Sequence, residues 1–223
     1  TMNVFMETIS EFESQVELLK MFGLPLKHIS KTKAQLSAFI LDAKQPTIPR
    51  QDEFDFSFPS TMAIAKYTDV IKFYDANRSY DKTLNIDVAG VPHTFAWGGL
   101  HGARDNYIGE GYFLNIDVAS YYPALMIEYG YLSRNVKNPD KFREIRDTRL
   151  KYKAAKDKRQ APLKIVINGT YGAMKDKYNG LYDPLMANNV CIGGMMLLLD
   201  LIERVEPYCT LIQSNTDGIL IKL

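Results

Sequence analysis

The sequence is poor in the residues that build metal-thiolate, disulfide and redox sites. Its 223 residues include two cysteines, Cys191 and Cys209, and three histidines, His28, His93 and His101. Neither set has the close spacing of a zinc site, and two isolated cysteines form no disulfide framework. We therefore expect the cysteines to pack as small hydrophobic side chains, as suits a reducing cytosol, and the histidines to have structural or solvent-facing roles.

The chain also lacks the pattern of a secretion signal or a membrane anchor. Residues 1–22 carry four glutamates and no basic stretch followed by an apolar one. The longest apolar stretch, near the end of the sequence, is interrupted by Asp200. We expect neither secretion nor membrane insertion, and a hydrophobic content of 46% is enough for one sizeable core or two small ones.

Charge of one sign is concentrated in a single segment. The formal net charge is +1, yet Lys137–Lys164 holds eleven basic residues against four acidic ones. Within it, Arg146, Arg149 and Lys153 would form a basic face on a helix that starts at Pro139. Such a segment suits a polyanionic partner, although a solvated helix face would carry the same charges.

Apolar periodicity and turn residues predict a mixture of helices and short strands. Thr8 with Glu11 has the pattern of a capping box, and Ser60 has that of a helix cap. The expected helices lie at 8–22, 31–42, 60–77, 121–129, 139–158, 160–174 and 185–203, and the expected strands begin at 81 and include 112–117, 208–213 and 218–223. The proline-containing stretch 43–59 is predicted to be a linker.

Three short blocks carry the residues that phosphoryl-transfer chemistry requires. They are NIDVASYYPAL at 115–125, KIVINGTYG at 164–172 and QSNTDGILIK at 213–222. The first and third place Asp117 and Asp217 where an apolar strand ends, and the second places a lysine and an asparagine one helical turn apart. Because two-metal phosphoryl transfer needs carboxylates that bridge the ions, the blocks predict a nucleotide-polymerising site.

The first two blocks resemble motifs A and B of the family B DNA polymerases, whose patterns are DxxSLYP and KxxxNxxYG. The first block matches at Asp117, Ser120, Tyr122 and Pro123, and it has Tyr121 in place of leucine. The second block matches its pattern fully.

The third block resembles motif C, YxDTDS, but departs from it. Asp217 matches the second aspartate, whereas Asn215 replaces the first aspartate and Gly218 replaces the closing serine; the opening tyrosine is also replaced. Upstream, Trp97–Gly99 resembles the glycine pair that joins exonuclease to polymerase in phage-type members. The resemblance covers roughly residues 93–223.

The resemblance implies an α+β fold with a polymerase palm, an antiparallel sheet backed by helices, and a short two-helix fingers insertion. It divides the chain into a helical connector at 1–80, a first palm part at 81–138 with motif A, fingers at 139–175 with motif B, and a second palm part at 176–223 with motif C. The connector would follow an exonuclease region that is missing, and a thumb is absent. We therefore interpret the sequence as a fragment.

The resemblance also implies the partners and residues of the site. The cofactor would be two Mg²⁺ ions, with Mn²⁺ as an alternative, and the partners would be primer–template DNA and deoxynucleoside triphosphates. The expected catalytic residues are Asp117, Asp217 and Lys164. The expected metal ligands are Asp117, the backbone carbonyl of Val118, and Asp217. The expected nucleotide-binding residues are Val118, Ser120, Tyr122, Arg146, Lys164, Asn168 and Tyr171.

Several of these roles have a physical basis in residue type and spacing. Lys164, Asn168 and Tyr171 lie at i, i+4 and i+7 and therefore share one helix face, which would contact the nucleotide. Tyr122 would pack under the sugar and leave no room for a 2′ hydroxyl. Asn215 supplies an amide oxygen without charge, so we expect it to weaken metal binding without abolishing the chemistry.

Two alternatives stay open. Another palm nucleotidyltransferase, such as a reverse transcriptase, would share the paired aspartates, although the KIVINGTYG block is typical of DNA polymerase fingers. A non-catalytic nucleic-acid-binding module would keep the basic segment and lose the metal-dependent chemistry. Under the leading interpretation we expect a phage- or prophage-type protein in the cytoplasm of a bacterium or of an infected host cell.

Overall fold

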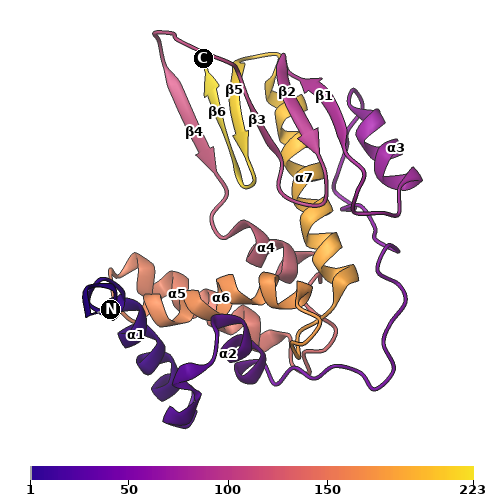
Figure 1. The fold of residues 1–223 in the computed structure, drawn as a ribbon. Coiled ribbons are helices and arrows are strands. Elements are labelled where there is room, and N and C mark those ends of the chain that lie inside the picture. Colours follow the sequence, from indigo (N-terminus) through magenta and orange to yellow (C-terminus); the bar gives the residue numbers. More distant parts are fainter. Residues whose placement is uncertain (1) are drawn as a thin grey trace. The chain divides into compact units, whose positions relative to one another are not determined.

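The chain folds into two compact units, each assembled from two separate stretches of sequence. A computed structural model describes residues 2–223, with side chains from residue 9 onward. The helical unit comprises Thr1–Gln51 and Leu132–Ala187, and the sheet unit comprises Asp52–Tyr131 and Asn188–Leu223. Figure 1 shows both units. The sheet unit holds all six strands together with helices, and the other unit is helical, as in an α+β fold.

The helical unit is built around α6. Its helices are α1 (Met2–Met21), the 3-10 helix η1 (Leu26–Ser30), α2 (Lys33–Ile40), α5 (Asp140–Ala154) and α6 (Gln160–Lys175). α6 contacts α1, α2 and α5. Its apolar residues are buried among these helices, whereas Lys164 and Asn168 are exposed. The helices predicted at 139–158 and 160–174 are therefore confirmed, with the first ending four residues earlier.

The helix starts near the N-terminus differ from those that the sequence predicts. α1 begins at Met2 and runs through Thr8, so the capping box expected at Thr8 is wrong. A capping box starts α2 instead. The amide of Gln35 donates to Oγ1 of Thr32 at 3.2 Å, and the amide of Thr32 donates to Oε1 of Gln35 at 3.1 Å. These reciprocal bonds satisfy two amides that the helix itself leaves unpaired.

The sheet unit contains a six-stranded antiparallel sheet. The strands are β1 (Leu84–Val88), β2 (Val91–Phe95), β3 (His101–Ala103), β4 (Phe113–Asp117), β5 (Thr210–Asn215) and β6 (Gly218–Lys222). Their order across the sheet is β1-β2-β3-β5-β6-β4. The strands predicted at 112–117, 208–213 and 218–223 are confirmed to within two residues at each end. The hairpin β5–β6 is central, and β4 is an edge strand beside it.

One long apolar helix supplies much of the core of the sheet unit. α7 (Pro184–Val205) starts in the helical unit and continues into the sheet unit, where it lies against one face of the sheet (Figure 1). Its buried residues there include Val190, Ile192, Met195, Met196, Leu198, Leu199 and Ile202. By length and composition α7 could span a membrane, and among the described residues no other helix could. However, 83% of its most apolar window is buried within the protein, as in the core helix of a soluble protein.

An aromatic cluster packs part of the predicted linker, residues 43–59, into the sheet unit. The ring of Trp97 lies 5.2 Å from that of Phe54, 5.8 Å from those of Phe56 and Tyr74, and 5.0 Å from that of Tyr80. All four contacts are edge-to-face, the geometry that aromatic pairs favour. The part of the linker that holds the two phenylalanines is therefore packed against the unit.

The helix predicted at 60–77 starts eight residues later than expected. α3 runs over Thr68–Ala76, and Ser60 caps nothing. The amides of Ala65 and Lys66 instead donate to the carboxylate of Glu203 on α7, at 2.9 to 3.1 Å. Because the carboxylate accepts hydrogen bonds from these two amides, they need no helical partners, which explains why the helix starts late.

The predicted connector at 1–80 is divided between the two units. Its first part, up to Gln51, packs with α5 and α6, and its second part, from Asp52, packs with the sheet. The remaining helix, α4 (Tyr121–Glu128), confirms the prediction at 121–129 and belongs to the sheet unit. It follows β4 directly, so the segment that carries motif A is a strand, a turn and a short helix.

Candidate active site

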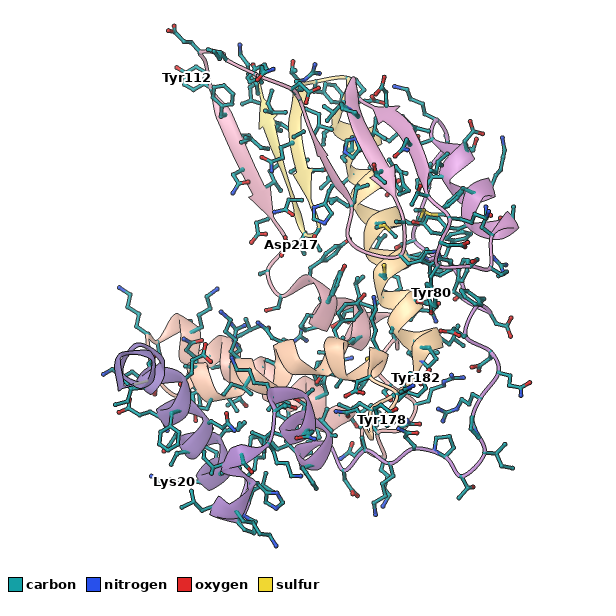
Figure 2. All side chains as sticks on the ribbon, viewed as in Figure 1. Lys20, Tyr80, Tyr112, Tyr178, Tyr182 and Asp217 are labelled. Atoms are coloured by element: carbon teal, nitrogen blue, oxygen red, sulfur yellow. The ribbon has the colours of Figure 1, made fainter. Side chains whose placement is uncertain are left out.

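Motifs A and C meet at one end of the sheet. β4 ends at Asp117, which pairs with Gly218 at the start of β6. Just beyond the strand, the amide of Val118 donates to the backbone carbonyl of Asp217 at 2.8 Å. Asp217 lies at the tip of the β5–β6 hairpin (Figure 2). The two aspartates thus occupy neighbouring strand ends that are joined through the backbone.

The strand register places further motif residues in line with Asp117. One row across the sheet runs Thr94, His101, Asn215, Gly218, Asp117, each residue paired with the next. Directly paired residues project from the same face of a sheet. The side chains of this row are exposed except at the glycine, so Asn215 and Asp117 share an open face on either side of β6.

Gly218 has a steric reason to depart from the serine of motif C. A Cβ atom at this position would lie 2.6 Å from the carbonyl oxygen of Ile116 and 3.3 Å from the Cα of Asp117. Side chains do not approach a backbone this closely, so a serine would require the two strands to shift. The missing side chain also leaves the row open between Asn215 and Asp117.

The turn between β5 and β6 is strained. Thr216 has φ of +39°, in the left-handed region where a β-branched residue is a rare outlier. Its amide donates to the carbonyl of Leu100 at 2.8 Å, and its hydroxyl lies 3.3 Å from Nε2 of His101. Conformations of this kind persist where surrounding contacts hold them, often at functional sites. Here the contacts come from β3 and the loop that precedes it.

Two tyrosines of motif A pack at the base of the same region. Ser120, at φ of +55°, turns the chain from β4 into α4. The hydroxyl of Tyr121 donates to the carbonyl of Gly194 on α7 at 2.7 Å, and this side chain is buried. Tyr121 therefore has a packing role where the family pattern has leucine.

Tyr122 is half-buried and interacts electrostatically with Asp217, one of the candidate metal ligands. Burial raises the pKa of its phenol, and Cys191 and the carboxylate of Asp217 raise that pKa further. Its ring packs against α7, since a Cβ at Gly194 would meet its Cε1 atom at 3.3 Å. The phenol thus stays protonated at neutral pH, and α7 supports one side of the ring.

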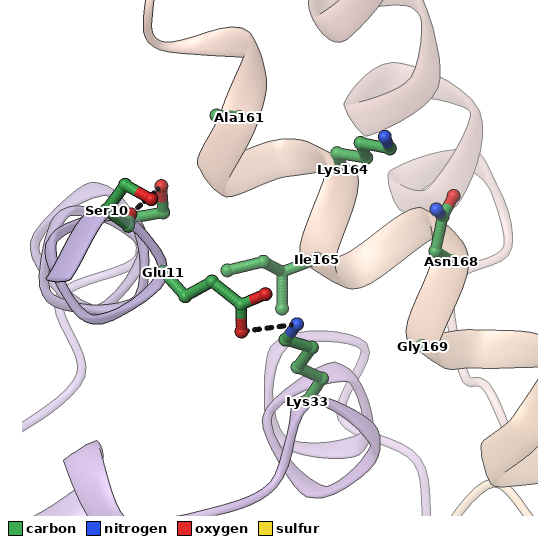
Figure 3. A pocket seen from close by; sticks show the side chains of 9 residues that line it. Ser10, Glu11, Lys33, Ala161, Lys164, Ile165, Asn168 and Gly169 are labelled. Carbon is green, nitrogen blue, oxygen red and sulfur yellow. Dashed lines mark hydrogen bonds and ion pairs between the residues drawn. The ribbon is translucent and has the colours of Figure 1, made fainter. Parts of the chain in front are cut away.

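Motif B forms one face of α6 in the helical unit. Lys164 and Asn168 are exposed on it, and Tyr171 is half-buried with the ammonium of Lys175 over its ring at 4.9 Å. A groove of about 490 Å³ follows this face (Figure 3). Its lining comes from α1, α2 and α6 and comprises Ser10, Glu11, Ser14, Lys33, Ala161, Lys164, Ile165, Asn168 and Gly169.

The sequence did not indicate that the first two helices border motif B. Lys33 of α2 and Glu11 of α1 form an ion pair of 3.0 Å in the wall of the groove. Both side chains are more than half exposed, so the pair contributes little to stability. Its effect is on charge, because Glu11 offsets one of the positive charges beside Lys164.

The basic face that the sequence predicts on α5 is not exposed as a whole. Arg149 is buried, and burial lowers the pKa of its guanidinium. Nε of Arg146 lies 2.6 Å from the carboxylate of Asp147, and its side chain is 16% exposed. Lys153 is exposed. A phosphate at Arg146 would therefore compete with Asp147, and the exposed charge of the segment comes mainly from its lysines.

The candidate site has few carboxylates. Among residues 9–223 no three His, Cys, Asp or Glu side chains gather as a metal site. The oxygen donors at this end of the sheet include the carboxylates of Asp117 and Asp217, the side-chain amide of Asn215 and backbone carbonyls of the same strand ends. An all-oxygen set of this kind fits a hard ion such as Mg²⁺, which keeps several waters and takes one or two carboxylates.

A solved structure of a known protein agrees with this fold. No family model and no curated protein matches the sequence. Among solved structures, the chain is similar to the family B DNA polymerase from the hyperthermophilic archaeon Pyrobaculum calidifontis, with a TM-score of 0.52 and 16% sequence identity. The match covers 100% of this chain and 30% of that polymerase. This chain therefore has the fold of a part, about 30%, of a family B DNA polymerase.

Proposed function

We propose that this chain is the palm-and-fingers part of a DNA-directed DNA polymerase of family B, of phage or prophage type. The observation that supports it best is the junction of Asp117 and Asp217 at two paired strand ends, inside a chain with the fold of a polymerase fragment. The sheet unit would be the palm, and α5 with α6 would be the fingers.

Asp117, Asp217 and the carbonyl of Val118 would hold two Mg²⁺ ions, or Mn²⁺ in their place. When bound, such ions activate the primer 3′ hydroxyl and stabilise the attacking and leaving oxygens of an in-line phosphoryl transfer. The chain's own contribution is to fix the ligands, because both carboxylates sit on backbone that is already paired. Asn215 would add an oxygen and no charge, leaving two formal negatives at the ions.

The residues of motif B would bind the nucleotide. Lys164 would neutralise the triphosphate and could protonate the leaving pyrophosphate, and Asn168 would hold the phosphates or the neighbouring loop. Both are exposed on α6 and so are accessible to a ligand. Tyr171 would lie under the nascent base pair, and Arg146 would bind a phosphate if Asp147 released it.

The wider context of this activity is also part of the proposal. The partners would be primer–template DNA and deoxynucleoside triphosphates, and the exonuclease and thumb would belong to parts of a longer polymerase. The activity would take place in the cytoplasm of a bacterium or of a phage-infected cell.

Metal-dependent nucleotide binding tests the proposal on this chain itself. Titration of Mg²⁺ or Mn²⁺ with a deoxynucleoside triphosphate, followed by calorimetry, should show binding that requires the metal. The double variant Asp117→Ala, Asp217→Ala should lose it. Asp105→Ala, which removes an exposed carboxylate of the sheet unit outside the motifs, should retain it. A chain that binds a primer–template duplex but shows no metal-dependent nucleotide binding would instead be a non-catalytic module.

Tyr122 provides a test of sugar selection. In the unaltered chain we expect deoxynucleotides to bind about 100-fold more tightly than ribonucleotides, the level of rejection that a closed pocket gives against one added hydroxyl. Tyr122→Ala should reduce the preference to less than about tenfold, since it removes the ring. Tyr122→Phe keeps the ring and should keep the preference. Equal discrimination by all three proteins in competition calorimetry would contradict the assignment.

A further inference from the structure

The motif C hairpin is held by residues outside its own two strands. We propose that His93 and the segment Gly99–Gly102 are positioning residues that fix Asp217 through Ser214 and Thr216. The inference rests on the proposed function, in which Asp217 is a metal ligand. None of these supporting residues belongs to the three motif blocks.

His93 binds the β5 strand from β2. It is buried, its Nδ1 lies 2.8 Å from the carbonyl oxygen of Val91, and its Nε2 lies 2.7 Å from Oγ of Ser214. Because a carbonyl only accepts, Nδ1 carries the hydrogen of the neutral ring and Nε2 accepts from the serine hydroxyl. Ser214, three residues before Asp217, is therefore held in one orientation.

Gly102 makes this bond possible. It lies between His93 and Ser214 in a register row of the sheet, paired with both. A Cβ at Gly102 would lie 2.5 Å from Cδ2 and Nε2 of His93. Any other residue would therefore push the imidazole away from the serine, and only glycine lets the ring cross β3 to reach β5.

The rest of the segment holds Thr216, the residue directly before Asp217. The amide of Thr216 donates to the carbonyl of Leu100, and its hydroxyl contacts Nε2 of His101, as described above. Gly99 lies directly against the threonine, because a Cβ there would be 3.0 Å from its Cβ and Cγ2 and closer still to Oγ1. The segment Gly99–Gly102 therefore packs against Thr216 and helps to hold its strained conformation.

These contacts bear on metal affinity because ligand orientation depends on them. The residue before Asp217 and the residue three positions before it are each bound to β2, β3 or the loop between them, and its own carbonyl accepts from Val118. Residues that orient metal ligands typically affect metal affinity about 10- to 100-fold when they are replaced. Loss of the support should therefore weaken metal binding while both carboxylates remain.

The double variant His93→Leu, Ser214→Ala separates positioning from stability. It removes both partners of the His93–Ser214 bond, so neither is left unsatisfied. The Val91 carbonyl also loses its bond from His93, but Val91 is still paired with Val88 in the β1–β2 hairpin, so we expect a small cost in stability. We expect a nearly unchanged melting temperature, Mn²⁺ affinity about tenfold weaker by calorimetry, and amide hydrogen exchange of residues 214–218 about tenfold faster without metal. His93→Gln retains an acceptor toward Ser214 and should restore both readouts.

Thr94→Val is the matched control. Thr94 neighbours His93 on β2, but its hydroxyl donates to Asn85 on β1 at 2.7 Å and not to the hairpin. It should leave exchange and Mn²⁺ affinity unchanged. If amide hydrogen exchange of residues 214–218 is as slow in the double variant as in the unaltered chain, the inference is wrong. Unaltered protein that binds no Mn²⁺ would overturn the proposed function instead, and the exchange measurement would still decide the role of His93.

Discussion

Asp217→Asn should weaken Mn²⁺ binding to this chain by at least about 100-fold. The variant keeps the shape of the side chain and removes one of the two formal charges at the site. Between charges a few ångströms apart near a protein surface, this loss corresponds to about 3 kcal/mol or more, and each 1.4 kcal/mol is a tenfold change in affinity. Calorimetric titration with Mn²⁺ measures it directly.

A relocated charge distinguishes the position of the carboxylate from the number of carboxylates. The double variant Asn215→Asp, Asp217→Asn has the same net charge as the unaltered chain, and its new carboxylate lies on the same sheet face as Asp117. We expect it to remain as weak as Asp217→Asn, since residue 217 is the one whose backbone is bound to motif A. Recovery to within threefold of the unaltered affinity would mean that charge alone matters.

Asp183→Asn should be the most destabilising conservative change in the helical unit. Asp183 is fully buried before α7, and its carboxylate accepts from Nε, Nη2 and the backbone amide of Arg134 at 2.7 to 2.9 Å. A guanidinium nitrogen of Arg50 lies 3.9 Å away. Breaking a buried ion pair costs about 3–5 kcal/mol, and we expect about 2–3 here because both arginines are near one-third exposed.

Thermal denaturation followed by circular dichroism measures this cost as a fall in melting temperature of about 5–10 °C. Asp157→Asn is the matched control. It removes a carboxylate that pairs with Arg159 at 2.6 Å in the turn between α5 and α6, where the arginine is more than half exposed. Exposed pairs contribute little. Equal melting temperatures for the two variants would show that the Asp183 network is not a main support of the unit.

The elements that carry the motifs could be predicted because their local patterns are strong. β4 and β6 are short apolar strands that end or begin at an aspartate or glycine, and α6 has a continuous helical period. The antiparallel hairpin around Asp217 followed from two strands separated by a short polar turn. The sequence could therefore predict that Asp117 and Asp217 lie at neighbouring strand ends.

The features that failed depend on contacts between distant residues. α3 starts late because Glu203, far away in sequence, takes the amides that a helix would have used. Arg149 is buried although it is charged and lies in the most basic segment of the sequence. Neither effect has a local signature.

His93 is different, because a signal for it was present. Val91, His93 and Phe95 alternate along β2 with two exposed residues, so the period of two puts the histidine on the buried face. A histidine on a buried face needs partners for both ring nitrogens. The alternation could therefore have indicated a structural bond, although not that Ser214 would be its partner.

The strand order also determines when the paired aspartates can come together during synthesis. Within residues 2–223, β4 pairs with no strand except β6. About 100 residues, including all of α5, α6 and α7, separate Asp117 from its partner Gly218. Pairings this distant in sequence form late, because a long loop must close first. On the ribosome, β4 would stay unpaired until the β5–β6 hairpin emerged, so a nascent chain that lacks this hairpin would have no assembled ligand pair with which to bind a metal ion.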